Sequence, residues 1–127
     1  MQKIVYLHGL GSSGATQTAD YLRNKLPEVE VISPDIPLQP EEALQMLNRL
    51  CYEVKPDVIV GTSMGAMYAQ QLHGYKKILV NPAFHVSEIM RNNIGTNKWL
   101  NPRRDGQTEF VIDEELCDLY QQMEESQ

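Results

Sequence analysis

Short apolar runs alternate with helix-periodic segments over the first 84 residues, and this alternation restricts the fold more than any other feature. The runs cover residues 3–7, 29–33, 57–61 and 76–80. Each is short, nearly continuous in apolar residues and bounded by glycine, proline or asparagine, as buried strands are. Strands separated by helices form parallel sheets that helices cover on both faces. The sequence therefore predicts an α/β fold with a doubly wound parallel sheet.

The segments between the runs have the apolar spacing of helices. One such face contains Ala15, Ala19, Leu22 and Leu26, and a second contains Ala43, Met46, Leu47, Leu50 and Val54. Pro40 suits the first turn of the second helix. A third helix is expected over residues 63–72. With the second strand outside the first, the strand order is 2-1-3-4, and the carboxyl ends of strands one and three are neighbours.

The pattern changes after Phe84, where we expect a small C-terminal cap instead of another strand and helix. Residues 86–91 suit a short helix, and residues 97–101 and 107–112 flank an Asp-Gly hairpin signal at Asp105. Asp113 is the expected N-cap of a last helix, whose apolar face contains Leu116, Leu119, Tyr120 and Met123. We therefore expect one domain over 1–127, with a core of residues 1–84 and a cap-like segment of 85–127.

Composition excludes several classes of protein. The net charge of the 127 residues is −6, which argues against nucleic acid as a partner, and eight acids without Lys or Arg after Arg104 indicate a solvated acidic helix. The apolar runs are too short for a membrane span or a signal peptide. Cys51 and Cys117 have neither metal-site nor disulfide spacing. We expect a cytoplasmic protein with reduced thiols, no metal, no cofactor and no membrane contact.

The strongest chemical signal is the G-x-S-x-G segment Gly61-Thr62-Ser63-Met64-Gly65. It follows a predicted buried strand and opens a predicted helix, which is the setting of a nucleophile elbow. A tight turn there lifts the serine hydroxyl clear of the sheet, and the helix N-terminus beside it supplies N–H groups for an oxyanion. Ser63 is therefore the expected nucleophile, and a plain glycine-rich turn is the alternative.

A second glycine-rich loop, residues 8–14, follows the first strand. Gly9-x-Gly11-x-x-Gly14 matches the dinucleotide-binding fingerprint, but the acid that such a domain needs at the end of its second strand is displaced to Asp35. In the predicted strand order this loop lies against Ser63. The backbone N–H groups of Leu10 and Met64 are then expected to converge on one oxygen and form an oxyanion hole.

The segments that carry these signals resemble the α/β-hydrolase superfamily, and within it the small bacterial esterases of the YqiA/YcfP type. The matching segments are Tyr6-Leu7-His8-Gly9 with Ser12-Ser13, Ser33-Pro34-Asp35-Ile36-Pro37, Gly61 through Ala66, and Leu79 through Ala83. They keep the family's order from Ile4 to Phe84, and Gly106 through Ile112 is similar to its cap region. The resemblance implies hydrolysis of small acyl esters or thioesters through an acyl-serine at Ser63.

The sequence departs from the superfamily where the other two members of a Ser-Asp-His triad are expected. No Asp or Glu lies between Ser63 and Phe84, and no histidine follows His85. We therefore expect the chain to stop short of the complete hydrolase and to be inactive or impaired. The alternatives are a non-catalytic pseudo-hydrolase that binds a ligand or partner and, third, a nucleotide-binding βαβ domain.

The remaining candidate residues have simpler interpretations. His8 is expected to order its loop by hydrogen bonds, and His73 to lie at a helix end. His85, near Glu88, is a minor candidate for a substitute base. Met64 and Met67 are expected in the core, and Trp99 on the sheet. Lys76-Lys77 and Arg103-Arg104 are expected in solvated turns.

The fourth strand is expected at an open edge of the sheet. Its residues Ile78, Leu79 and Val80 are apolar, and an apolar edge with unpaired N–H and C=O groups templates pairing with another chain. We therefore expect a homodimer through this edge.

Overall fold

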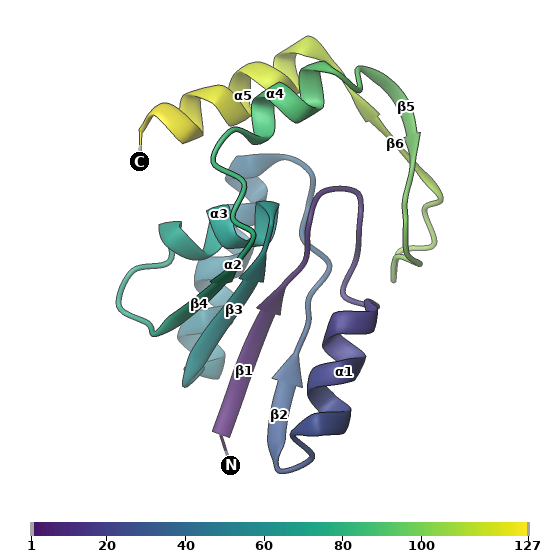
Figure 1. Ribbon diagram of the computed structural model, residues 1–127. Helices are drawn as coiled ribbons and strands as arrows, with labels where there is room; N and C mark the ends of the chain where they lie inside the picture. The colour runs from purple at the N-terminus through teal and green to yellow at the C-terminus, as the bar shows by residue number, and fades with distance from the viewer. Residues whose placement is uncertain (1, 127) are drawn as a thin grey trace.

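The computed structural model describes residues 2–126 and arranges them as a four-stranded parallel sheet with a C-terminal hairpin and helices (Figure 1). In chain order the elements are β1 (Gln2–Leu7), α1 (Gln17–Lys25), β2 (Val29–Ile32), α2 (Pro40–Val54), β3 (Val58–Thr62), α3 (Met64–Gln71), β4 (Lys77–Val80), α4 (Val86–Arg91), β5 (Gly95–Lys98), β6 (Glu109–Ile112) and α5 (Glu114–Glu125).

The sheet has the order β2-β1-β3-β4, and every neighbouring pair is parallel. Val5 of β1 is in register with Ile32 on one side and Ile59 on the other. The predicted fold class, strand order and C-terminal hairpin plus helix are therefore confirmed. The four strands differ from their predicted bounds by at most one residue at either end, because hydrogen-bond pairing and not apolar composition decides where a strand ends.

Alternate residues of the central strands face two separate cores. Val5, Leu7 and Ile59 pack with α2 and α3, whereas Ile4 and Tyr6 pack with Ala19 of α1. Both faces of β1 are buried, which explains its nearly continuous apolar composition. In Figure 1, α1 lies on one side of the sheet and α2 and α3 on the other.

Helix ends follow the sequence signals in α2 but not in α1. Pro40 begins α2, and Lys55 ends it in the left-handed conformation with φ 54°. In α1 the N-cap is Thr16, whose hydroxyl accepts a hydrogen bond from the Ala19 amide, so Ala15 lies outside the helix and is exposed. The expected apolar face was wrong at that position because capping, and not apolar spacing, decides where the helix begins.

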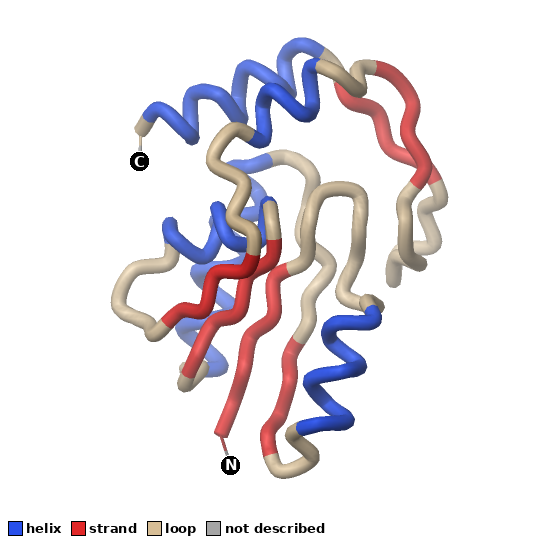
Figure 2. Tube along the Cα trace, viewed as in Figure 1, coloured by secondary structure: helices blue, strands red, loops and turns tan. Residues whose placement is uncertain are grey.

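The C-terminal residues fold back over the carboxyl ends of the strands. β5 and β6 pair antiparallel, with Gly95 opposite Ile112, and α4 and α5 run side by side (Figures 1 and 2). The hairpin strands are Gly95–Lys98 and Glu109–Ile112, so the Asp-Gly lies within a long connection rather than in a tight two-residue turn. Asp113 caps α5 as predicted, accepting a hydrogen bond from the Leu116 amide at 2.8 Å.

No helix within residues 2–126 is long and apolar enough to cross a membrane. Cys51 and Cys117 are buried free thiols, as expected, and burial raises the pKa of Cys51 to about 11.

Candidate active site

Ser63 occupies the turn between β3 and α3 in a strained backbone conformation. Its φ is 55° and its ψ is −116°, a region that residues with a Cβ rarely adopt. Such a conformation costs about 1 to 3 kcal/mol and persists only where the surroundings impose it. The side chain is half-buried and makes no capping hydrogen bond to α3. The turn therefore presents the hydroxyl instead of using it to cap the helix.

The backbone of Ser63 is held from three directions. Its N–H donates to the Val80 carbonyl at 3.0 Å, and its carbonyl accepts from the amides of Ala66 and Ala83 at 3.0 and 3.2 Å. These bonds join β3, β4, α3 and the segment after β4 at one residue. They supply the constraint that the strained conformation needs.

The two glycines of the motif allow close approach of the chain around Ser63. A Cβ on Gly65 would overlap the Leu7 carbonyl of β1, and a Cβ on Gly61 would lie 2.6 Å from the Gly65 carbonyl oxygen. Both positions are therefore closed to larger residues by backbone atoms that cannot move aside. The two glycines therefore allow α3 to pack closely against β1 and β3, and the serine between them occupies the turn.

The loop after β1 lies directly against Ser63. A Cβ placed on Gly9 would be 3.9 Å from the Ser63 Oγ. The Gly9 carbonyl accepts hydrogen bonds from His8 Nδ1 at 2.8 Å and from the Ser12 amide at 3.2 Å. Because a trans peptide is planar, holding the Gly9 carbonyl also orients the Leu10 N–H toward the opposite side. Among the hydrogen bonds of residues 2–126, the Leu10 and Met64 amides donate none.

His8 is a structural residue of this loop. It is 1% exposed, and its Nε2 accepts a hydrogen bond from the Ile36 amide at 2.9 Å. Nδ1 therefore carries the ring proton and donates to Gly9. Burial, with the nearby Arg103 charge, lowers the pKa of His8 to about 4, although the Gly9 bond and Asp35 oppose the shift. The expectation that His8 orders its loop is confirmed, and its acceptor nitrogen is occupied.

Arg103 is half-buried and lies outside a turn, so the expected solvated turn was wrong for that residue, whereas Arg104 lies exposed in a turn as expected. Arg103 Nη1 donates to the Ser12 carbonyl at 2.9 Å and its Nη2 to the Ile36 carbonyl at 3.0 Å. Arg104 Nη2 donates to the Ser33 carbonyl at 3.0 Å. The free carbonyls of two loops, which local sequence does not reveal, bind both side chains, and Arg103 is half-buried between the two loops.

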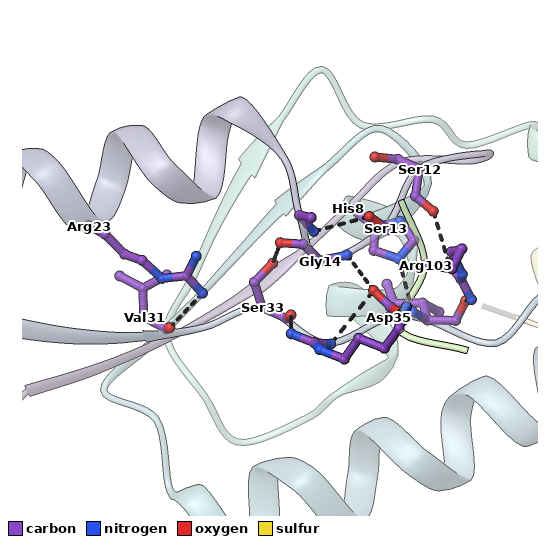
Figure 3. Close-up of polar contacts among 12 residues, drawn as sticks. His8, Ser12, Ser13, Gly14, Arg23, Val31, Ser33, Asp35 and Arg103 are labelled. Carbon is purple, nitrogen blue, oxygen red and sulfur yellow. Dashed lines mark hydrogen bonds and ion pairs between the residues drawn. The ribbon is translucent and has the colours of Figure 1, made fainter. Parts of the chain in front are cut away.

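Asp35, in the loop after β2, is bonded to the loop after β1 and to the connection between β5 and β6. Its Oδ1 accepts from the Gly14 amide at 2.7 Å and its Oδ2 from the Arg104 amide at 2.8 Å. Burial by itself raises the pKa of Asp35, but these hydrogen bonds and the Arg103 and Arg104 charges bring it below its usual value. Figure 3 shows these groups converging between the loop after β1 and the loop after β2.

The third glycine of the dinucleotide-like pattern is used for packing. A Cβ on Gly14 would overlap the Ser33 carbonyl, and the Gly14 amide is already bonded to Asp35. The Ser12 amide is bonded to the Gly9 carbonyl. These are amides that a phosphate-binding loop would leave free for its ligand. Gly14 therefore has a packing role that requires no nucleotide.

The other two histidines, His73 and His85, differ in how closely their segments of the chain approach Ser63. His73 is exposed beyond the last residue of α3, and eight residues of helix span about 12 Å. His85 is exposed at the start of α4, two residues after Ala83, whose amide binds the Ser63 carbonyl. His85 is thus the histidine whose segment approaches Ser63 more directly.

Met64, Met67 and Trp99 pack as apolar side chains. Met64 is 2% exposed and Met67 is fully buried, which confirms their core interpretation. Trp99 packs on Phe110 with ring centroids 4.1 Å apart and beneath the Arg103 guanidinium at 4.1 Å. It therefore packs on the hairpin and on Arg103. Within residues 2–126 no group of three His, Cys, Asp or Glu side chains is placed to hold a metal ion.

Fold and site together define an α/β protein whose parallel sheet presents a strained serine at a strand–helix turn. The chain belongs to the uncharacterised protein family UPF0227, whose family model matches residues 3–127.

Proposed function

We propose that this protein is a serine hydrolase of the esterase or thioesterase class, with Ser63 as the nucleophile that accepts the acyl group. The observation that carries the proposal is the Ser63 backbone, held at φ 55° and ψ −116° with its hydroxyl left free. A serine that merely capped α3 would have an extended backbone, and its side-chain oxygen would accept a hydrogen bond from an amide of the helix. The resemblance to α/β-hydrolases supports the same reaction class.

In the proposed reaction the Ser63 Oγ attacks the acyl carbonyl carbon while the hydroxyl proton passes to a base or to water. The carbonyl oxygen becomes an oxyanion, for which the N–H groups of Leu10 and Met64 are the proposed donors. The bond to the leaving alcohol or thiol then breaks, and Ser63 carries the acyl group as an ester. Attack by water releases the acid and restores the hydroxyl.

The residues of this chain support acylation better than turnover. No acid lies between Ser63 and Phe84, and no histidine follows His85, so the chain holds no Ser-Asp-His order. An oxyanion hole and binding alone retain on the order of 10³-fold to 10⁴-fold catalysis over water when a triad member is missing. We therefore propose that Ser63 is acylated faster than an ordinary serine while steady-state hydrolysis is slow.

The test is acylation by p-nitrophenyl acetate, followed by peptide mass spectrometry. We expect Ser63 to gain one acetyl group, a mass increase of about 42 Da. This acylation is expected to be at least about 100-fold faster than acylation of Ser126, an exposed serine of the same chain. Ser63→Ala is expected to remove the fast phase. His85→Gln then shows whether that side chain takes the proton. Acylation of Ser63 no faster than that of Ser126 would overturn the proposal and favour a ligand-binding pseudo-hydrolase.

A further inference from the structure

The connection between β5 and β6 is bonded to the loop that carries Leu10. The Leu100 amide donates to the Gly11 carbonyl at 2.7 Å, and Asn101 Nδ2 donates to the Ser12 Oγ at 2.7 Å. Arg103 Nη1 adds a third bond, to the Ser12 carbonyl. Three residues 89 to 91 positions later in the chain therefore hold the last two residues of the turn Gly9–Ser12.

Unlike Leu100 and Asn101, Arg103 also joins the turn Gly9–Ser12 to the loop after β2. Its two terminal nitrogens bind the Ser12 carbonyl after β1 and the Ile36 carbonyl after β2, and its guanidinium stacks on Trp99. The Ile36 amide in turn binds His8, the residue that holds the Gly9 carbonyl. A planar guanidinium fixes the spacing of two acceptors as a flexible ammonium does not. Arg103 thereby closes a ring of contacts around the Gly9–Leu10 peptide.

We propose that Arg103 is a positioning residue for the oxyanion donor at Leu10, bridging the Ser12 and Ile36 carbonyls so that the Gly9–Leu10 peptide keeps its orientation toward Ser63. This inference rests on the proposed function. Arg103 lies in the connection between hairpin strands and touches neither Ser63 nor, in the proposed reaction, the substrate. It acts through the turn Gly9–Ser12.

The position of one amide matters because an oxyanion donor must lie about 3 Å from the developing charge. A misplacement of about 1 Å in a reacting or stabilising group costs up to about 100-fold in rate. Without Arg103 the turn keeps its own Ser12-to-Gly9 hydrogen bond, and the bonds of Gly14 to Asp35 and of His8 to Ile36 remain, but the bridge from the Ser12 carbonyl to the Ile36 carbonyl is lost. The fold then survives while the Leu10 N–H samples other positions.

Two measurements on Arg103→Met test this role. Hydrogen exchange over residues 9–14 is expected to accelerate on the order of 10-fold, because two charge-assisted hydrogen bonds are lost. Acylation of Ser63 by p-nitrophenyl acetate is expected to slow by about 10-fold to 100-fold. Arg103→Lys, which keeps the charge but binds one carbonyl at a time, is expected to recover part of both effects.

The matched control is Arg91→Met. Arg91 also bridges two acceptors with its guanidinium, Asp118 and Gln121, but does so between α4 and α5. It is expected to leave exchange in residues 9–14 and acylation of Ser63 unchanged. Wild-type acylation in a folded Arg103→Met variant, or an equal loss in Arg91→Met, overturns the positioning role. Unreactive Ser63 in the wild-type protein overturns the proposed function instead, and the two failures are thereby separated.

Discussion

His8 stays neutral in the fold because both ring nitrogens are committed to backbone partners. Protonation of Nε2 would replace its acceptor lone pair by a second donor facing the Ile36 N–H. Arg103 nearby opposes the added charge, and Asp35 favours it. The ring therefore holds the Gly9 carbonyl in one tautomer across the neutral pH range.

Lowering the pH should protonate His8 and break its hydrogen bond with the Ile36 amide. The folded-state pKa of His8, about 4, lies below the ordinary histidine value of 6.5, so the unfolded chain binds the proton more tightly. The stabilisation is fully present above pH 6.5 and is lost as pH falls toward 4, for a total of about 3 kcal/mol. Asp35, whose pKa is also lowered, adds a further loss at lower pH, below the ordinary aspartate value of 3.8.

Urea unfolding at pH 7 and pH 4.5 measures this loss. We expect His8→Gln to be less stable than the wild type at pH 7 but to lose less stability on acidification. His73→Gln, a substitution at an exposed histidine, serves as the control and should retain the wild-type pH dependence. The same pH dependence in His8→Gln and in the wild type would contradict the assignment.

A buried pair of phenols joins helix α5 to the core, beside its buried Leu116 and Cys117. The Tyr120 hydroxyl donates to the Leu38 carbonyl at 2.7 Å, and the Tyr68 hydroxyl lies 2.6 Å from the Tyr120 oxygen. Tyr120 has a single hydroxyl proton, so Tyr68 is the donor within the pair. Burial raises the pKa of both groups, which keeps both neutral. The pair links α3, α5 and the segment before α2.

The two phenols should therefore differ in their contribution to stability. Tyr120→Phe leaves the Tyr68 hydroxyl and the Leu38 carbonyl without partners, at a cost of about 2 to 4 kcal/mol in the free energy of unfolding. Tyr68→Phe removes one bond but leaves Tyr120 donating to Leu38, at a cost of about 1 kcal/mol. Urea unfolding of the two variants checks this order, and equal costs would contradict the assigned donor.

At the scale of the whole molecule, β4 forms an open edge of the sheet. The carbonyls of Lys76 and Val80 accept bonds from β3, so the N–H and C=O groups of Lys77 and Leu79 face outward. The side chains of Ile78 and Val80 are 53% and 42% exposed. An edge of this kind pairs readily with another strand.

We expect a second copy of the chain to pair with this edge in antiparallel register. A two-fold axis at Leu79 would exchange hydrogen bonds between the two Leu79 residues and place Ile78 opposite Val80 of the second copy. Lys77 would then face Asn81 of the second copy, so no like charges are opposed. A parallel arrangement would bring the lysines of both copies together and would not close into a dimer.

Sedimentation equilibrium checks this pairing. We expect a dimer for the wild type, a monomer for Ile78→Lys and a dimer for Ile89→Lys, a matched substitution at an exposed isoleucine of α4. Leu79→Pro removes an outward N–H without removing a bond to β3 and should also give a monomer. A wild-type protein that stays monomeric at high concentration would rule out the pairing.

Local patterns in the sequence were sufficient for the sheet, its strand order and the serine turn. Apolar runs, the G-x-S-x-G spacing and the Asp113 cap depend on contacts within a few residues, so composition and spacing report them directly. The same patterns placed Ala15 in α1, began the first hairpin strand two residues too late at Asn97, and began the second two residues too early at Gln107. Those boundaries depend on caps and pairing partners.

Only the tertiary structure decided how the candidate site is held. Arg103 and Arg104 stand beside Asp105 and Gly106, so their local sequence indicated a turn in solvent. Their acceptors are the carbonyls of Ser12, Ser33 and Ile36, which lie 67 to 91 positions away along the chain. Which carbonyls remain unpaired after the sheet has formed is a property of the assembled fold. For that physical reason no local pattern could have revealed this role of Arg103.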